Sequence, residues 1–226
     1  MIIVENLVKK FKTGDSELIA LKGVSFKVAE GQFLAITGKS GSGKSTLLYQ
    51  MGALDFPTNG SVYIDGKDIV KMGNRERTEL RLMELGYVFQ DYALLPELTA
   101  VENVMAPLMM QGAPKKQARM ISEESLRKVG LEHKLYNKPS QLSGGEQQRV
   151  SIARAIGHNP KIIFADEPTA NLDSETSKIV LDIFLGLHKK GQTIVMVTHE
   201  SEYAVLAERI IRLSDGEIIS DEKNKQ

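Results

Sequence analysis

The chain has 226 residues, and its 29 lysines and arginines balance its 29 aspartates and glutamates, so the formal net charge is zero. This balance argues against a protein held on nucleic acid by bulk charge, and we expect no nucleic-acid partner, although a local basic patch is compatible with it. The absence of cysteine excludes disulfides, thiolate metal sites and a cysteine nucleophile.

The first predicted elements are two strands with a polar connection. Residues 2–8 and 24–28 alternate apolar and polar side chains, as strands do, and residues 12–17 form a polar loop between them. Phe11 precedes this loop and follows two lysines. An aromatic ring there either stacks on a nucleotide base or belongs to the core, and the pattern leaves both readings open.

A glycine-rich loop follows the next strand. Residues 33–37 are an apolar strand, and residues 45–51 begin a helix. The loop between them fits G-x-x-x-x-G-K-[ST], which binds phosphates through backbone N–H groups and the positive end of the helix dipole. We expect Lys44 to reach the β- and γ-phosphates and Ser45 to ligate Mg²⁺. The competing reading is an ordinary turn. The residues proposed to bind nucleotide here are Gly38, Lys39, Ser40, Gly41, Ser42, Gly43, Lys44, Ser45 and Thr46.

The middle of the chain changes from strands to helices. Residues 60–66 read as a strand and turn, residues 75–85 as an amphipathic helix, and residues 86–89 as a short buried strand that ends at Gln90. Ligands of parallel sheets bind at the ends of such strands, so Gln90 is a candidate to contact Mg²⁺ or water. No strand is expected in residues 91–159.

Two helices are expected within this strand-free segment. Thr99 can cap a helix through Met110, with Glu102 at the capping-box position. Pro114 opens another helix that runs to about Val129. Apolar side chains here either form a surface for a partner or fill the core of the segment, namely Tyr92, Ala93, Leu94, Leu95, Pro96, Met105, Met109 and Met110.

A second run of small residues begins the next helix. Ser143-Gly144-Gly145 combines bare backbone amides with a helix N-terminus, so it is a second potential phosphate cradle. One chain needs only one such cradle to hold the γ-phosphate. A second cradle makes sense if it serves the nucleotide of another copy of the chain. The alternative is a glycine turn capped by Ser143.

The last third of the chain alternates strands and helices. Residues 162–167 form an apolar strand that ends in Asp166-Glu167, where Asp166 would hold the Mg²⁺ shell and Glu167 would polarise the attacking water. His199 follows another apolar strand and could donate to the γ-phosphate. The remaining elements are expected to be a helix at 174–190, strands at 193–197, 209–213 and 217–220, and a loose charged tail at 221–226. Together the pattern predicts an α/β fold with a parallel sheet and helices on both faces.

The order and spacing of these motifs resemble the ATP-binding subunits of ABC transporters over essentially the whole chain. The resemblance rests above all on Leu142-Ser-Gly-Gly-Glu-Gln-Gln148 after the glycine-rich loop. It implies a P-loop NTPase core with an N-terminal antiparallel β region and an inserted helical subdomain. It also implies one domain over residues 1–226, with a nucleotide-binding core at 1–90 and 160–226 and a helical and signature subdomain at 91–159.

The resemblance further implies a site shared between two chains. Two ATP molecules would lie between the glycine loop of one subunit and Ser143, Gly144, Gly145 and Glu146 of the other, in an ATP-dependent head-to-tail homodimer. Asp173 would cross the dimer interface, and Phe11 would take the adenine-stacking position. The implied catalytic residues are Glu167, His199, Gln90 and Lys44, the metal ligands are Ser45, Gln90 and Asp166, and the cofactors are ATP and Mg²⁺.

The finer motifs indicate one subfamily and a membrane partner. The runs Pro168–Asp173 and Glu146–Arg149 resemble the corresponding runs of one subfamily, which contains lipoprotein-release, macrolide-export and antimicrobial-peptide-resistance ATPases. The cell-division ATPase is close to this subfamily. No apolar run approaches the ~18 residues of a spanning helix, and residues 1–6 lack a secretion signal. We therefore expect a cytoplasmic chain held at the inner face of the membrane by permease subunits.

Two other classes remain as alternatives. A permease-independent soluble ABC ATPase would usually fuse two such domains or carry long coiled coils, which are absent here. A phosphate-loop kinase would leave the second cradle and Glu167 without a purpose.

Overall fold

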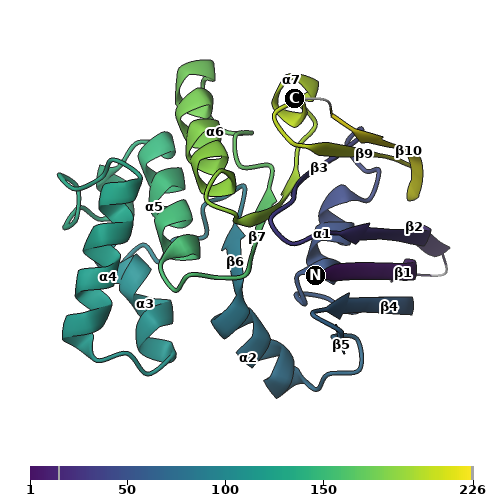
Figure 1. The fold of residues 1–226 in the computed structure, drawn as a ribbon, viewed down its shortest axis with the longest axis horizontal. Helices are drawn as coiled ribbons and strands as arrows, with labels where there is room; N and C mark the ends of the chain where they lie inside the picture. The colour runs from purple at the N-terminus through teal and green to yellow at the C-terminus, as the bar shows by residue number, and fades with distance from the viewer. Residues whose placement is uncertain (15, 225–226) are drawn as a thin grey trace.

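A computed structural model gives the structure of the protein and describes residues 1–14 and 16–224. Within them, a six-stranded sheet has the order β10-β9-β3-β8-β7-β6, and only the β9–β10 pair is antiparallel (Figure 1). Its strands are β3 (Phe33–Thr37), β6 (Leu85–Val88), β7 (Ile162–Asp166), β8 (Thr193–Val197), β9 (Arg209–Ser214) and β10 (Glu217–Lys223). The predicted α/β class with a parallel sheet is confirmed.

A second, antiparallel sheet lies beside the first and has the order β2-β1-β4-β5. Its strands are β1 (Ile2–Thr13), β2 (Ser16–Val28), β4 (Asn59–Ile64) and β5 (Lys67–Asp68). The polar loop expected at 12–17 is wrong, because β1 and β2 continue as a hairpin in which Phe11 pairs with Leu18 and Lys12 with Glu17. Pairing with a partner strand holds these polar residues extended, which their own pattern did not indicate.

Alternation along β3 places the parallel sheet between two hydrophobic cores. Leu34 and Ile36 pack with α1 (Lys44–Met51) and the antiparallel sheet, whereas Phe33 and Ala35 face the core shared with the remaining helices. Both faces of the sheet are thus covered, as its continuous apolar strands require. Helix α1, which follows the glycine loop, is held between the two sheets (Figure 1).

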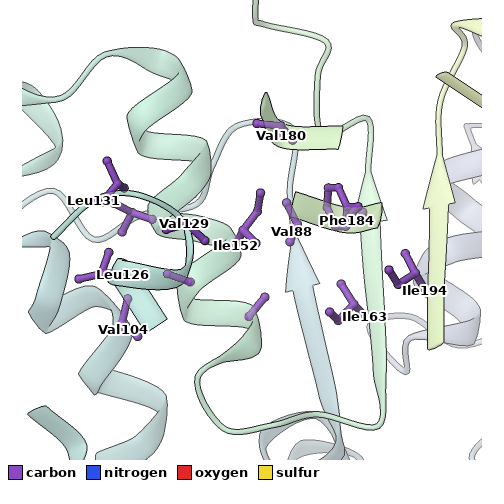
Figure 2. Packing of buried hydrophobic residues seen from close by; sticks show 14 of the residues in the cluster. Val88, Val104, Leu126, Val129, Leu131, Ile152, Ile163, Val180, Phe184 and Ile194 are labelled. Carbon is purple, nitrogen blue, oxygen red and sulfur yellow. The ribbon is translucent and has the colours of Figure 1, made fainter. Parts of the chain in front are cut away.

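The strand-free segment forms helices α3 (Ala100–Met110), α4 (Lys115–Lys128) and α5 (Gly144–Ile156), with a short 3-10 turn at Pro139–Gln141. The expected capping box holds the start of α3, since Thr99 Oγ1 accepts from Glu102 N and Glu102 Oε2 accepts from Thr99 N. Val104, Leu126 and Ile152 of these helices pack in one cluster with Ile163 and Ile194 of the sheet (Figure 2). The helical segment therefore shares its core with the parallel sheet.

The other helices are α2 (Asn74–Glu84), α6 (Ser174–His188) and α7 (Ser201–Ala204). The loose tail expected at 221–226 is corrected for its described part, because Asp221–Lys223 complete β10. Asp221 forms a two-bonded ion pair with Arg209, and Asn224 donates to the carbonyls of Val205 and Ala207. Residues 225–226 lie outside the described residues.

The three methionines singled out earlier separate into two environments. Met105 is buried in the core, while Met109 and Met110 are 47% and 71% exposed. In the described part of the chain, no helix has the length and apolar character needed to cross a bilayer.

Candidate functional site

A cavity of about 930 Å³ opens at the carboxyl ends of β3, β7 and β8, where the glycine loop lies. Strand-end loops of parallel sheets meet at this edge, so residues distant in sequence converge here. The lining residues that we had predicted as site residues are Phe11, Gly38, Lys39, Ser40, Gly41, Gly43, Lys44, Ser45, Thr46, Gln90, Glu167 and His199.

The conformation of the loop depends on glycines at two close approaches. A Cβ on Gly38 would lie 2.2 Å from the carbonyl oxygen of Leu213, and a Cβ on Gly43 would lie 2.5 Å from that of Ala20. Gly43 also has a φ of 99°, in the left-handed region that glycine adopts without strain. The loop is thereby clamped against β9 and β2, with its concave side toward the cavity. Ser42 is buried behind it and does not line the cavity.

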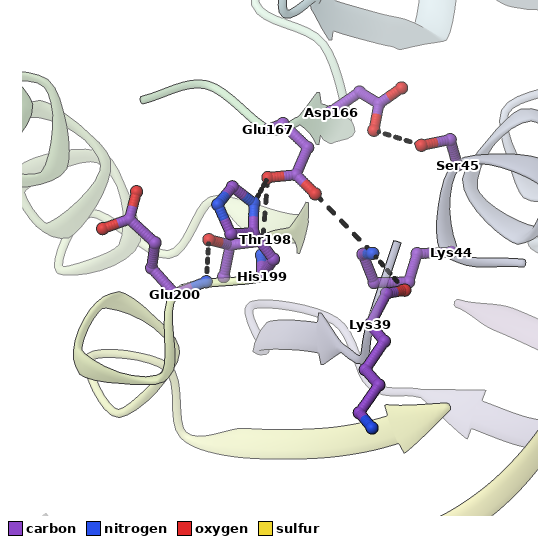
Figure 3. Close-up of polar contacts among 8 residues, drawn as sticks. All are labelled: Lys39, Lys44, Ser45, Asp166, Glu167, Thr198, His199 and Glu200. Atoms are coloured by element: carbon purple, nitrogen blue, oxygen red, sulfur yellow. Dashed lines mark hydrogen bonds and ion pairs between the residues drawn. The ribbon is translucent and has the colours of Figure 1, made fainter. Parts of the chain in front are cut away.

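Lys44 is held inside the loop. Its side chain is 6% exposed, and Nζ donates to the carbonyl oxygen of Lys39 at 3.1 Å. The same ammonium lies 3.7 Å from Glu167 Oε1, across the cavity (Figure 3). A buried ammonium is favourable only beside acceptors or anions, so the position suits a phosphate.

Ser45 and Asp166 form an oxygen-rich corner beside Lys44. Ser45 Oγ donates to Asp166 Oδ1 at 2.8 Å (Figure 3). Burial and a hydrogen bond to Asp166 raise the pKa of the Tyr49 hydroxyl, which therefore stays protonated and is a donor to this carboxylate. The described residues contain no cluster of three or more His, Cys, Asp or Glu side chains able to hold a metal. Mg²⁺ fits this corner because it is commonly bound by one or two carboxylates together with substrate phosphates.

Glu167 follows β7 in a left-handed conformation, with φ of 47°. Residues with a Cβ rarely adopt this region, and such strain is concentrated at functional sites. A backbone hydrogen bond of 3.0 Å to Val197 anchors it, and its Oε2 lies 2.5 Å from Nδ1 of His199. The carboxylate is thus fixed between His199 and Lys44 (Figure 3).

Gln90 and Phe11 also line the cavity. Gln90 is exposed there, and its carbonyl accepts from Asn171 Nδ2 at 3.0 Å. Phe11 is 39% exposed, with the ammonium of Lys9 at 4.9 Å from its ring centroid. The alternative that Phe11 is a core aromatic is therefore wrong, and its ring is available for stacking.

The second predicted cradle lies outside this cavity. Ser143 Oγ accepts from Glu146 N at 3.2 Å and Glu146 Oε2 accepts from Ser143 N at 2.8 Å, so the two residues cap α5 reciprocally. The hydrogen bond from the Ser143 backbone lowers the pKa of Glu146. Asp173 caps α6 without such reciprocity, since its carboxylate accepts from Thr176 N at 2.9 Å and from Thr176 Oγ1 at 2.7 Å. Neither these residues nor Gly144 and Gly145 line the cavity.

Several cavity residues were not predicted from the sequence. Those that come from strands whose pairing no local pattern indicates are Leu18, Ala20, Arg212, Leu213, Ser214 and Ile219, and the remaining ones are Thr37, Ala170 and Ser201. Outside the cavity lining, Tyr49 could have been found as a partner of Asp166, because it lies one helical turn after Ser45 and shares its face.

A glycine loop between a buried strand and a helix, with a lysine inside it and an aspartate from a neighbouring strand beside its serine, defines a P-loop nucleotide-binding protein. A protein-family model described as "ABC transporter" matches residues 21–170. The lipoprotein-releasing system ATP-binding protein LolD of Aquifex aeolicus is 51% identical over 201 residues, covering 89% of this chain and 90% of the relative. The macrolide export ATP-binding/permease protein MacB of Aggregatibacter actinomycetemcomitans is 46% identical over 226 residues, which are 100% of this chain and 35% of the relative.

A solved structure matches equally well. The ATP-binding cassette MJ0796, in a dimeric post-hydrolysis state bound to ADP and Pi, superposes with a TM-score of 0.94 at 43% identity, over 100% of both chains. The chain therefore belongs to the ABC transporter family and is an ATP-binding cassette of the kind found in LolD and MacB.

Proposed function

We propose that this cassette binds two ATP molecules between two copies of the chain and uses their hydrolysis to move a membrane permease. The observation that carries the proposal is the separation of the two cradles. The glycine loop lines the cavity, whereas exposed Ser143 and the start of α5 lie outside it. Head-to-tail pairing would bring the second cradle of one copy onto the γ-phosphate held by the other.

The predicted site residues have separate roles in this proposal. Phe11 stacks on the base, and the amides of residues 38–46 and Lys44 hold the phosphates. Glu167 accepts a proton from the attacking water, and His199 orients the Glu167 carboxylate and donates to the γ-phosphate. Ser45, Asp166 and Gln90 would hold Mg²⁺, which when bound would neutralise charge on the β- and γ-phosphate oxygens.

ATP binding and hydrolysis would switch the two copies between a closed dimer and an open form. The γ-phosphate adds negative charge at the dimer interface, and the N-terminus of α5 from the partner copy neutralises it. Loss of the γ-phosphate removes the contacts that favour the closed dimer, so the equilibrium returns toward the open form. Asp173, at the start of α6, lies at the crossing between the copies in this arrangement.

An apolar groove suits the permease. It has a volume of about 260 Å³ and lies between α2, α3 and the loop after Gln90. Exposed Leu95, Met109 and Met110 extend the apolar surface beside it. The residues that line the groove are Arg81, Leu82, Leu85, Gly86, Tyr87, Phe89, Ala93, Pro107, Met110, Arg154, Ala155 and His158.

The proposed cargo class follows the relatives' names, lipoprotein release for LolD and macrolide export for MacB. Peptide export or extraction, or mechanical signalling through the permease, belongs to the same proposal. Residues 1–226 would act as one domain, with 91–159 as its helical and signature subdomain, at the cytoplasmic face of the membrane. The shared core of the sheet and the helical segment supports one domain.

Glu167→Gln tests this function. The variant keeps the shape of the side chain but cannot accept the proton, so we expect ATP binding to persist and hydrolysis to fall about 10²–10⁴-fold. We also expect a stable ATP-bound dimer, measured by size exclusion with light scattering. A variant that remains monomeric at saturating ATP would refute the shared site.

The second candidate function is that of an ABC ATPase that works without a permease. The cell-division type of ABC ATPase is a further alternative, and it does act with a permease. Purification from detergent-solubilised membranes separates these classes. We expect a stoichiometric integral membrane protein to co-purify with the wild-type chain and to be lost when groove residue Met110 is replaced by aspartate. Its absence in both preparations would favour the soluble class.

A further inference from the structure

The loop after Gln90 has an unusual backbone. Tyr92 and Ala93 are consecutive left-handed residues, with φ of 63° and 48°. Neither is glycine, so each carries a Cβ that makes this region unfavourable. Local hydrogen bonds, from Tyr92 N to Phe89 O at 3.2 Å and from Ala93 N to Asp91 O at 2.7 Å, close the turn but leave the Tyr92 and Ala93 carbonyls for other donors.

Arg154 supplies those donors from the last turn of α5. Its Nη2 donates to the carbonyl oxygen of Tyr92 at 3.0 Å, and its Nη1 donates to that of Ala93. Nη2 also lies 3.4 Å from Ser151 Oγ on the same helix. A guanidinium can reach both carbonyls because its donors form a rigid planar fork.

The same loop touches the other end of α5. A Cβ on Gly144 would lie 2.8 Å from the Tyr92 hydroxyl, so the tyrosine ring packs directly on the first residue of the helix. Tyr92 is therefore held at its carbonyl by the C-terminal turn of α5 and at its hydroxyl end beside the N-terminal turn. Tyr92, two residues after Gln90, therefore contacts residues from both ends of α5.

We propose that Arg154 is a positioning residue that sets the orientation of Gln90 by holding Tyr92 and Ala93 in their left-handed conformation. The inference rests on the role proposed above for Gln90. Asn171 Nδ2 holds the carbonyl of Gln90 from the other side of the site, so the glutamine is tethered between two fixed points. Without the Arg154 fork, the loop relaxes to negative φ and the Gln90 side chain leaves its position.

The two hydrogen bonds from Arg154 to the carbonyls of Tyr92 and Ala93, here called the tether, also lie beside the apolar groove. Arg154 and Ala93 both line it, so a protein segment in the groove contacts the tether itself. Movement of that segment changes the two hydrogen bonds and hence the position of Gln90. The Arg154 side chain thus lies between the groove and the segment that carries Gln90 into the catalytic cavity.

The test compares Arg154→Lys with Arg154→Lys/Ala93→Gly. Lysine keeps the charge but loses the fork, so we expect kcat for ATP to fall about tenfold while KM stays within about twofold, because the phosphate loop and Phe11 are unchanged. Glycine adopts the left-handed conformation freely, so the double variant should regain at least about threefold in kcat. Arg119→Lys is the matched control, since that arginine also donates to two acceptors, Glu123 Oε1 and the Tyr136 hydroxyl, but on the exposed face of α4 and away from the loop after Gln90.

Each outcome decides the matter. An Arg154→Lys enzyme with wild-type kcat overturns the inference, as does one whose lost activity tracks a lower Tm and is not restored by Ala93→Gly. Gln90→Ala separates this failure from failure of the proposed function. If Gln90→Ala loses kcat and Arg154→Lys does not, the role of Gln90 stands and the tether is wrong. If Gln90→Ala keeps kcat, the role of Gln90 and the tether are both wrong, while ATP hydrolysis itself stands.

Discussion

Glu167 has two polar neighbours, one at each carboxylate oxygen. The Lys44 ammonium lies 3.7 Å from Oε1, and the His199 ring, with Nδ1 at 2.5 Å from Oε2, fixes the direction of the carboxylate. A γ-phosphate in the cavity would compete with Glu167 for Lys44, because both anions seek the same buried cation. Binding of the triphosphate would thereby free Glu167 to act on water, so one lysine links binding to catalysis.

Replacing Lys44 by alanine tests the binding half of this link. The variant loses a charge-assisted contact worth about 1.5–3 kcal/mol, so we expect the Kd for ATP to rise roughly 10- to 150-fold in a fluorescent-nucleotide titration. Lys39→Ala is the matched control, because it removes the same charge from the same loop but from an exposed side chain. Solvent screening should make its effect much smaller. Equal affinity of Lys44→Ala and wild type would exclude the loop as the phosphate site.

At the scale of elements, the glycines of α5 serve a purpose beyond bare amides. Gly144 makes room for Tyr92, and a Cβ on Gly145 would lie 2.0 Å from Thr176 Cγ2. Thr176 in turn donates through its amide and its hydroxyl to Asp173. The start of α5 is therefore in direct contact with the loop after Gln90 and with the start of α6, and a shift of one should displace the others.

The contact between α5 and α6 predicts a compensating pair of substitutions. Gly145→Ala overpacks it, and we expect a loss of about 1–3 kcal/mol in the free energy of unfolding, measured by urea denaturation. Thr176→Ser removes the clashing methyl but keeps the hydroxyl that bonds Asp173. In the Gly145→Ala background it should therefore recover most of the loss, giving a coupling energy in a double-mutant cycle. Additive effects would show that the clash is absent.

The elements were predictable where their signals are local, as at the Thr99 capping box and the apolar strand that ends in Asp166. The glycine loop, Glu167 and His199 were also correctly brought to one cavity, because parallel strands end at one edge of a sheet. Signals failed where a distant partner decides the structure. Asp221 is strand rather than tail because Arg209 holds it, and Leu18 joins the cavity wall because β2 pairs with β1.

At the scale of the whole molecule, the two segments proposed to form one nucleotide site lie apart in a single chain. The glycine loop and Glu167 line the cavity. Ser143 caps the start of α5, and this helix lies beside α3 and α4 on the helical side of the fold (Figure 1). Both cradles belong to elements anchored in the packed cores, so neither can reach the other by a local loop movement. In the proposed dimer, a second copy in head-to-tail orientation would complete both sites at once, and the same symmetry would close the assembly at two chains.

Mixed dimers give a direct test of this symmetry. Lys44→Ala damages the glycine loop and Ser143→Arg blocks the exposed second cradle, so each variant alone should be nearly inactive. In a dimer of one with the other, one site combines two damaged halves and the other combines two intact halves. If the sites turn over independently, an equal mixture should recover about one quarter of wild-type ATPase activity, because about half of the dimers are mixed and each has one working site.

The activity test assumes that the two sites turn over independently. Counting bound ATP in the mixed dimer does not depend on that assumption. With Glu167→Gln added to both variants to prevent turnover, a tagged and purified mixed dimer should retain about one ATP, whereas each parent variant should retain almost none. A site contained within one chain predicts the reverse. The Ser143→Arg chain would then keep its own nucleotide without any partner, and mixing would add neither bound ATP nor activity. Retention of ATP only in the mixed dimer would show that each site is formed by two chains.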